Sequence, residues 1–310
     1  GTPLTNNSTE SGYVVGGGQL RTPDGSDWSL IIFSHLQSFE STFSTQPTRN
    51  SETLALDQEV PSTALGGSLQ WGRRLGAHRL TAGTDLRWIE GETDEGVFTP
   101  AGFLRRRVAG GEQFLAGLYG QDIISLSSRW ELVVGARVDY WRSSNGFRTD
   151  RPPPAGIPAS QSFADRDKVA VSPRVALLFH PSMATTLRGS AYQGFRAPTI
   201  NELFRRFQVR NDVTAANDKL DPERLTGGEV GIEHGFGKGV WARLTGFWNE
   251  VEDSIANVTL PQGQRLPDCP VPTTCRQSQN LDRTRIRCVE HEVRYRPTAN
   301  WELLASYLFV

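Results

Sequence analysis

The clearest pattern in the chain is an alternation of apolar and polar residues in the segment WELVVGARVDYW, residues 130–141. One set of alternate positions, from Trp130 to Tyr140, is apolar throughout, whereas the other set contains Glu131 and Asp139. Because successive side chains of a strand point to opposite faces, this period predicts a strand between an apolar and a polar environment. Its twelve residues exceed the five or six of an ordinary strand and match a tilted strand that crosses a bilayer.

Three further segments show the same period less cleanly, at residues 78–88, 285–296 and 301–310. Their outward positions are predicted to face lipid, with His291 as a polar exception. Tryptophans close to predicted short turns are expected to form an aromatic girdle, because amphipathic rings favour the membrane surface. Trp248 is out of phase with Trp241 and is left out of this girdle. The girdle tryptophans are Trp28, Trp71, Trp130, Trp241 and Trp301.

Short turns and long polar segments alternate along the chain. The turn signals lie at residues 22–27, 73–77, 126–129, 181–184, 235–239 and 297–300. The long segments lie at residues 39–61, 91–111, 143–167, 196–227 and 256–283. Soluble domains rarely carry several long loops of this kind, whereas outer-membrane barrels combine short periplasmic turns with long extracellular loops. We therefore predict an all-β fold, a transmembrane antiparallel β-barrel, of which about twelve strands are present.

The composition excludes a bundle of transmembrane helices. Mean hydropathy is -0.41, and 22% of the residues are charged. The longest apolar runs, residues 28–33 and 175–179, are far shorter than the roughly 18–20 residues of a spanning helix. The net charge of -1 provides no electrostatic field for binding nucleic acid.

No arrangement of residues predicts catalysis, so we expect neither enzymatic activity nor a cofactor nor a resident metal. The histidines are scattered, and no glycine-rich segment has the spacing of a phosphate-binding loop. The acidic segment at residues 211–223 lacks the spacing of a calcium-binding loop and favours a polar loop with an Asx turn. The histidines are His35, His78, His180, His234 and His291.

Several motifs, in their order along the chain, resemble those of TonB-dependent outer-membrane receptors. The strongest are SPRVALLFHP at residues 172–181, GFRAPTINELF at 194–204 and NDKLDPERLTGGEVGIE at 217–233. Weaker similarity lies at 119–141, 244–255 and 285–297, where Cys288 replaces the usual glycine, so the resemblance covers roughly residues 78–310. The residues that carry the two central motifs are Gly194, Phe195, Arg196, Ala197, Pro198, Glu202, Leu203, Asn217, Leu220, Pro222, Glu223, Glu229 and Gly231.

The resemblance implies a barrel of 22 strands with an N-terminal plug inside it. No segment of residues 1–310 reads as a plug or a TonB box, so we expect the chain to be part of a single barrel domain. The implied function is active uptake of a scarce ligand, such as a ferric siderophore or cobalamin, across the outer membrane of a Gram-negative bacterium. The implied partners are the TonB complex, acting through the plug, and outer-membrane lipid and lipopolysaccharide.

Two other functions remain open from the sequence. A passive porin-type channel would share the barrel pattern, although the ordered motifs argue against it. A soluble all-β binding module is the second alternative, and the long apolar face of residues 130–140 argues against that one. The sequence does not identify the ligand.

Two groups of arginines place positive charge in the predicted loops. Arginine pairs well with carboxylates and catecholates, so they could attract an anionic ligand. Local pairing with carboxylates such as Asp94 and Glu95, or contact with lipopolysaccharide phosphates, is the favoured alternative because loop charges are usually paired or solvated. The arginines are Arg105, Arg106, Arg107, Arg205, Arg206 and Arg210.

The cysteines and the GFRAP motif have structural interpretations. Cys269 and Cys275 either form a local disulfide in an oxidising environment or remain two free thiols, and Cys288 is expected to be a small buried residue. For GFRAP we expect Gly194 to adopt an unusual backbone at a strand end. Pro198 should end the strand ladder, and Arg196 should pair with Glu202.

Overall fold

The computed structural model is a single large sheet with very little helix. It describes residues 3–48, 50–209, 212–264, 266, 268–269 and 273–310. Fifteen strands belong to the sheet, and twelve of them have nine residues or more. No helix among these residues is long and apolar enough to cross a membrane.

The strand lengths divide the sheet into a wall and small additions. The long strands are β1 (Asn6–Arg21), β2 (Ser26–Thr48), β3 (Ser51–Leu75), β4 (His78–Thr99), β5 (Gly102–Ser125), β6 (Trp130–Arg151), β8 (Arg166–Ser182), β9 (Thr185–Arg196), β12 (Glu223–Gly237), β13 (Val240–Thr259), β14 (Thr274–Thr298) and β15 (Trp301–Phe309). The short elements are β7 (Ser160–Ser162), β10 (Phe207–Val209), β11 (Asp212–Ala215), α1 (Ile200–Phe204) and the 3-10 turn η1 (Gln262–Gln264).

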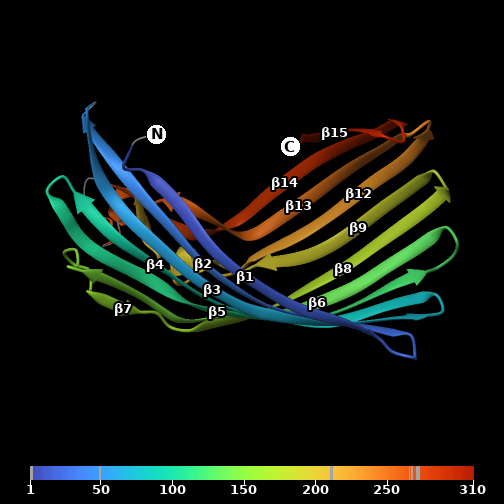
Figure 1. Cartoon of the computed structure of the whole chain (residues 1–310), viewed down its shortest axis with the longest axis horizontal. Coiled ribbons are helices and arrows are strands. Elements are labelled where there is room, and N and C mark those ends of the chain that lie inside the picture. Colours follow the sequence, from blue (N-terminus) through green and yellow to red (C-terminus); the bar gives the residue numbers. More distant parts are fainter. Residues whose placement is uncertain (1–2, 49, 210–211, 265, 267, 270–272) are drawn as a thin grey trace.

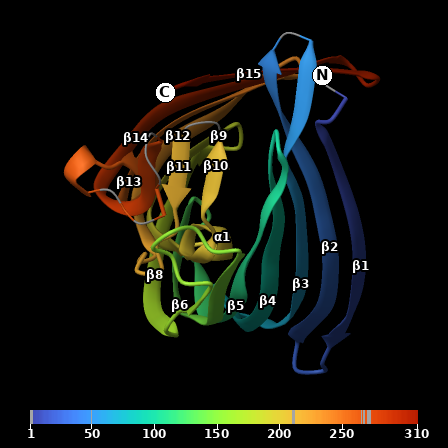
Figure 2. The same ribbon diagram turned by 90° about the vertical axis from the view of Figure 1, so that its left-hand side faces the viewer.

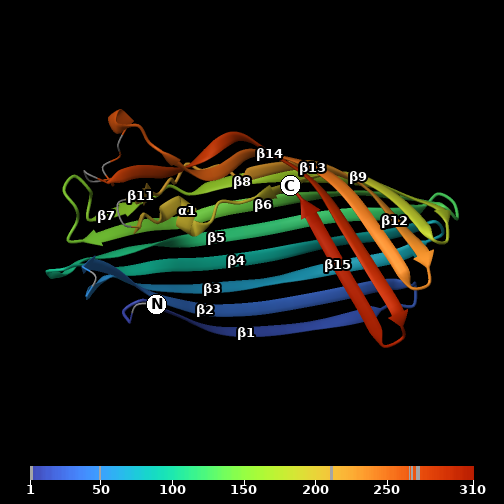
Figure 3. The ribbon, with the colours of Figure 1, turned by 90° about the horizontal axis from the view of Figure 1, so that it is seen from above.

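The long strands pair in sequence order, each antiparallel to the next. They curve into an open trough whose two rims are β1 and β15 (Figures 1 and 3). Within the described chain, β1 pairs only with β2 and β15 pairs only with β14. The predicted count of about twelve strands and the partial barrel are confirmed.

All six predicted short turns join consecutive long strands at one end of the trough, which we call the short-turn end. The opposite end is the long-loop end. There β2 with β3, and β4 with β5, continue as paired strands through the predicted long segments 39–61 and 91–111. The other long connections carry β7, α1, β10, β11 and η1. In these two connections the backbone is therefore hydrogen-bonded as strand, where the sequence predicted long loops.

The two faces of the sheet differ as the period in β6 predicts. The concave face carries α1 (Figure 2) and includes Trp141, which is fully buried. Arg137, on the same face, pairs with Asp85 at 2.6 Å. Val134 and Val138 lie on the convex face and are 37% and 44% exposed. The convex face is therefore the apolar one.

Most of the tryptophans predicted for the girdle lie on the convex face, as the prediction requires, but the prediction is wrong for Trp241. Trp28 and Trp71 lie directly opposite each other on β2 and β3, and Trp130 stacks on Phe179 with ring centroids 4.1 Å apart. Trp241 instead faces the concave side, where the guanidinium groups of two arginines lie 5.0 and 5.3 Å from its ring centroid. Its position on β13 has the parity of Arg243 and Thr245, so closeness to a turn was a poorer guide to the face than strand register.

Trp248 belongs to the convex face and is 40% exposed. It is paired with Arg287 across β13 and β14 and lies seven residues from Trp241, so the two rings occupy opposite faces. A second set of aromatic rings lies on the convex face closer to the long-loop end. There Phe114 is directly opposite Trp88, and the ring centroids of Phe114 and Tyr140 are 6.5 Å apart. Aromatic side chains thus border the apolar convex band on both sides.

Candidate functional site

The connection between β9 and β12, residues 197–222, folds back onto the concave face, and we call it the inner loop. It begins with α1, whose N-cap is Thr199. The backbone amide of Glu202 donates to the Thr199 hydroxyl at 3.2 Å, and the Thr199 amide donates to the Glu202 carboxylate at 2.7 Å. This reciprocal capping box satisfies amides that a helix of five residues would leave without partners. The sequence TINE therefore fixes where the helix starts.

A small hydrophobic core holds the inner loop against the wall. Trp141 of β6 packs with Leu203 and Phe204 of α1 and with Leu220 from the end of the loop, and all four are buried. Phe204 lies over Gly111, where an added Cβ would be 2.9 Å from its ring. The lack of side chains beneath the ring allows this close approach. Two motif residues, Leu203 and Leu220, thus act through packing.

Arg196 links the two ends of the inner loop. Its guanidinium lies 3.1 Å from Glu202 and 2.6 Å from Glu223, the residue with which it is also paired across β9 and β12. The expected ion pair with Glu202 is present, and Glu223 is an additional partner. The expectation for Gly194 is wrong, because β9 continues to Arg196 and Gly194 is an ordinary paired strand residue without positive φ.

The returning half of the loop is fixed by hydrogen bonds from neighbouring strands. The Lys219 amide donates to the Asn217 side-chain oxygen at 3.1 Å, which is the expected Asx-type turn. The Asn217 amide group donates to the Ser278 carbonyl at 2.9 Å. Arg166 donates to the carbonyl of Leu220 at 2.7 Å. Pro222 follows two residues after Leu220, and β12 begins at Glu223.

Three of the predicted loop arginines have local acidic partners. On the convex side, the Arg106 Nε donates to Asp94 at 2.8 Å. On the concave side, Arg107 is buried and lies 3.1 Å from Glu95, while the Nε of Arg205 lies 3.0 Å from the same carboxylate. Glu95 is 1% exposed. Two positive side chains therefore share one deeply buried carboxylate.

Arg206 differs from its neighbours because its buried side chain has no acidic partner in the described part of the chain. It is 4% exposed, and its Nε has no hydrogen bond to any described residue. No ion pair of Arg206 or Arg105 is found among the residues that the structure describes. Burial, and next the positive charge of Arg107, lower the pKa of Arg206 to about 10. Arg210 lies outside the described residues.

The acidic residues around these arginines do not balance their charge. Arg107 also approaches Asp150 at 3.3 Å, and Arg148 approaches Asp268 at 2.7 Å. The described cluster therefore contains five arginines and three carboxylates, an excess of two positive charges. The arginines are Arg105, Arg107, Arg148, Arg205 and Arg206, and the carboxylates are Glu95, Asp150 and Asp268.

A second small core lies beside this cluster. Cys269 and Cys275 form a disulfide with a Cα–Cα distance of 5.4 Å. Both pack against Val213 of β11, which pairs in parallel with β14. The disulfide is therefore local to the connection between β13 and β14, and its packing against Val213 brings that connection into contact with the inner loop. Cys288 is a free buried cysteine on β14, as expected.

The motif residues Glu229 and Gly231 lie apart from the inner loop, further along β12. Glu229 approaches Arg188 at 4.0 Å, and the Arg188 Nε would be 2.8 Å from a Cβ added to Gly231. These residues shape the concave wall. The residues of the central motifs therefore contribute to two parts of the structure, the inner loop and the concave side of β12.

Sequence reasoning missed Trp141, Arg148 and Asp150 as parts of the site. Trp141 carried a usable signal, because it is a large aromatic residue at a position that shares its parity in β6 with Arg137 and Asp139. The other two lie beyond the regular alternation, past a β-bulge at Asn145, which has a φ of 53° and lies where the register between β5 and β6 shifts. Register there could not be read from the sequence alone.

The family of the chain follows from comparison with known proteins. The family model "TonB dependent receptor-like, beta-barrel" matches residues 2–309. The chain belongs to this family, a class of outer-membrane receptor barrels, and the resemblance in the motifs is confirmed. No curated protein matches the sequence.

Solved structures share the fold at low sequence identity. The copper transporter OprC matches 98% of this chain with a TM-score of 0.72 and 18% identity, and 47% of its own length is covered. The ferric yersiniabactin uptake receptor FyuA from Yersinia pestis matches 97% with a TM-score of 0.67 and 14% identity, and 42% is covered. The alcaligin outer-membrane receptor FauA from Bordetella pertussis matches 99% of this chain with a TM-score of 0.64 and 14% identity, and 47% of its own length is covered. The chain thus spans about half the length of these structures.

Proposed function

We propose that this chain forms about half of the barrel wall of a receptor that actively takes up a scarce ligand across the outer membrane. The observation that carries the proposal is the inner loop, which is fixed by its own core on the concave face and presents buried arginines there. In this arrangement the convex face contacts lipid, the short-turn end faces the periplasm and the long-loop end faces outward. Binding and transport, not catalysis, are the expected activities.

The side chains of the concave face favour a barrel filled by another domain and argue against a passive pore. Tyr13 and Val15 of β1 and Ile31 of β2 have concave-face parity, and they are 64%, 53% and 45% exposed. A water-filled channel has a polar interior, and exposed apolar side chains of this kind indicate a binding surface. We propose that a plug domain covers them and that the TonB complex acts on the plug. The porin alternative leaves these side chains without a role.

An uptake assay tests the function. Cells that carry the full-length receptor should accumulate a labelled ligand from a panel of ferric citrate, a ferric catecholate, a copper salt and cobalamin. We expect a protonophore to abolish this accumulation, because active transport needs an energised inner membrane. Cells without the receptor are the control. Accumulation that survives the protonophore, with liposome swelling by the purified protein, would show a passive channel.

Within this function, we propose that Arg105 and Arg206 are the loop arginines available to an anionic ligand. Arg106, Arg107 and Arg205 already have acidic partners. A buried guanidinium without a partner is costly, and an oxyanion would satisfy it with strong charge-assisted hydrogen bonds. The local pairing expected for loop arginines therefore applies to three of them and leaves two for the ligand.

Arg206→Gln should weaken binding of an anionic ligand about tenfold, which corresponds to the loss of one charge-assisted hydrogen bond. Arg106→Gln is the matched control, because Arg106 is 64% exposed and bound to Asp94; its effect should be small. Equilibrium binding to the purified receptor at constant ionic strength measures both. Equal effects of the two substitutions would indicate a general field effect and contradict a role for Arg206.

A further inference from the structure

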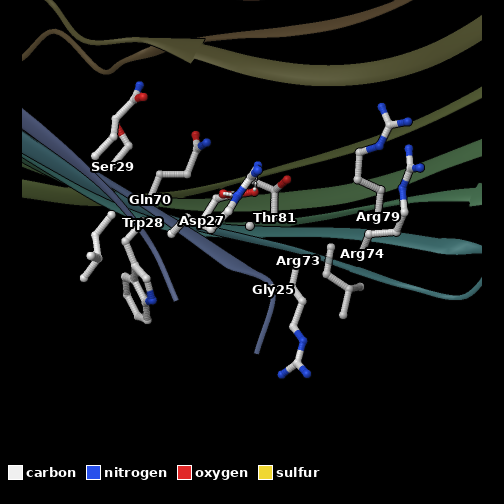
Figure 4. Close-up of a pocket in the computed structure, with 14 residues that line it drawn as sticks. Gly25, Asp27, Trp28, Ser29, Gln70, Arg73, Arg74, Arg79 and Thr81 are labelled. Carbon is white, nitrogen blue, oxygen red and sulfur yellow. Dashed lines mark hydrogen bonds and ion pairs between the residues drawn. The ribbon is translucent and has the colours of Figure 1, made fainter. Parts of the chain in front are cut away.

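A hollow of about 960 Å³ lies at the short-turn end of the sheet, over β1 to β4. Neutral polar side chains, among them Ser29, Gln70 and Thr81, line it. Figure 4 shows Gln70, Arg74 and Arg79 on one side of the sheet, whereas Trp28 and Arg73 point to the other side. The hollow therefore opens on the concave face, and we call it the short-turn groove.

Arg74 and Arg79 place two like charges directly opposite each other in this groove. They are partners in the register of β3 and β4. Side chains in such a pair have Cβ atoms about 5 Å apart, and like charges there destabilise the sheet. Neither arginine has an ion pair among the residues that the structure describes.

The nearby carboxylates are already engaged. Asp27, which also lines the groove, lies 2.7 Å from Arg21. Asp24 lies 3.0 Å from Arg73 on the other side of the sheet, and Asp122 lies 2.6 Å from His78. The groove therefore keeps two positive charges that nothing in the described wall balances.

We propose that an acidic polypeptide segment docks in the short-turn groove, with a carboxylate held between Arg74 and Arg79. Guanidinium groups bind carboxylates through two parallel hydrogen bonds, and the pair would convert a repulsive contact into a shared ion pair. The groove is too large for a single small anion, and its amide and hydroxyl side chains can pair with the backbone of an extended segment. The site is separate from the inner loop at the opposite end of the wall.

Zero-length cross-linking with a carbodiimide tests this docking, because the reagent joins a lysine amine to a carboxylate in contact and leaves arginine unmodified. Full-length receptor in isolated outer membranes would carry Arg74→Lys or Arg79→Lys, which keep the charge. Residues 1–310 contain only three other lysines, Lys168, Lys219 and Lys238, so few competing products arise from this part of the receptor. Mass spectrometry of digested protein then identifies the carboxylate that is joined.

We expect a cross-link from position 74 or 79 to an Asp or Glu outside β1 to β4, and its identity will show which polypeptide supplies the segment. The parent protein, with arginine at both positions, should lack this product. A cross-link to Asp27 alone, or no cross-link at either position, would overturn the proposal; a small anion such as phosphate would give the latter result.

Two ion pairs of the structure serve as controls for a negative result. Lys168 lies 3.1 Å from Asp221 and should react in every variant. Arg73→Lys, whose side chain points to the other side of the sheet from Arg74, should cross-link to Asp24 and reports that this hairpin is folded. Neither readout depends on transport, so failure of the docking proposal is distinguishable from failure of the uptake function.

Discussion

Replacing Trp141 by alanine is expected to release the inner loop from the wall while the barrel remains folded. Trp141 is fully buried and contacts both α1 and the end of the loop through Leu203, Phe204 and Leu220. Truncating a buried Trp or Phe to alanine costs about 3–5 kcal/mol. The lower part of that range already raises amide exchange in the loop more than about 100-fold. Hydrogen exchange of residues 199–220 in detergent micelles measures the effect.

The control for this substitution is Trp248→Ala, which truncates the same kind of side chain on the convex face. Trp248 is 40% exposed and contacts no part of the inner loop core. Exchange in the loop should stay at the parent rate in this variant. Retained migration of the unheated folded barrel on a denaturing gel would verify that both variants keep the wall. A loop that stays protected in Trp141→Ala would show that its ion pairs hold it without the core.

Glu95→Gln should disrupt the long-loop end of the site almost as strongly. The change removes the buried carboxylate shared by Arg107 and Arg205 and leaves both guanidinium groups facing a neutral amide. Breaking a buried ion pair by removing one partner costs about 3–5 kcal/mol, because the other charge stays buried without compensation. We expect increased protease cleavage after Arg205 or Arg206 and faster amide exchange in α1.

Asp94→Asn is a matched control from the adjacent residue. Its partner Arg106 is 64% exposed, and exposed ion pairs contribute little because water and salt screen them. The two variants make the same chemical change and differ in burial and in the face of β4 on which they lie. If Asp94→Asn loosened α1 as much as Glu95→Gln, burial of Glu95 would not be the cause.

Much of the wall could be predicted because strand period and turn position are local properties of the sequence. The alternation in residues 130–141 assigned Val134 and Val138 to one face and Arg137 and Asp139 to the other, and the burial of these side chains agrees. The six short turns were visible because each interrupts two alternating runs. The order of the motifs along the chain also indicated the family to which it belongs.

The interior of the site could not be predicted because it depends on contacts between distant segments. Glu95 and Arg205 are 110 residues apart in sequence, and no local pattern places them together. The roles of Leu203 and Leu220 required knowledge that the loop turns inward onto the concave face, where Trp141 lies. Trp241 was misassigned because its distance from a turn was used where strand parity decides the face.

The two faces of this wall meet different solvents, and the small core around Trp141 lies on the face toward water. In the proposed membrane orientation, hydrocarbon surrounds the convex side chains, and there is little hydrophobic driving force among groups already in lipid. The core under α1 is instead formed against water, so its stability follows the hydrophobic effect, which weakens on cooling and in urea. The ligand-facing loop and the wall that carries it should therefore respond separately to temperature and denaturant, although one continuous chain builds both.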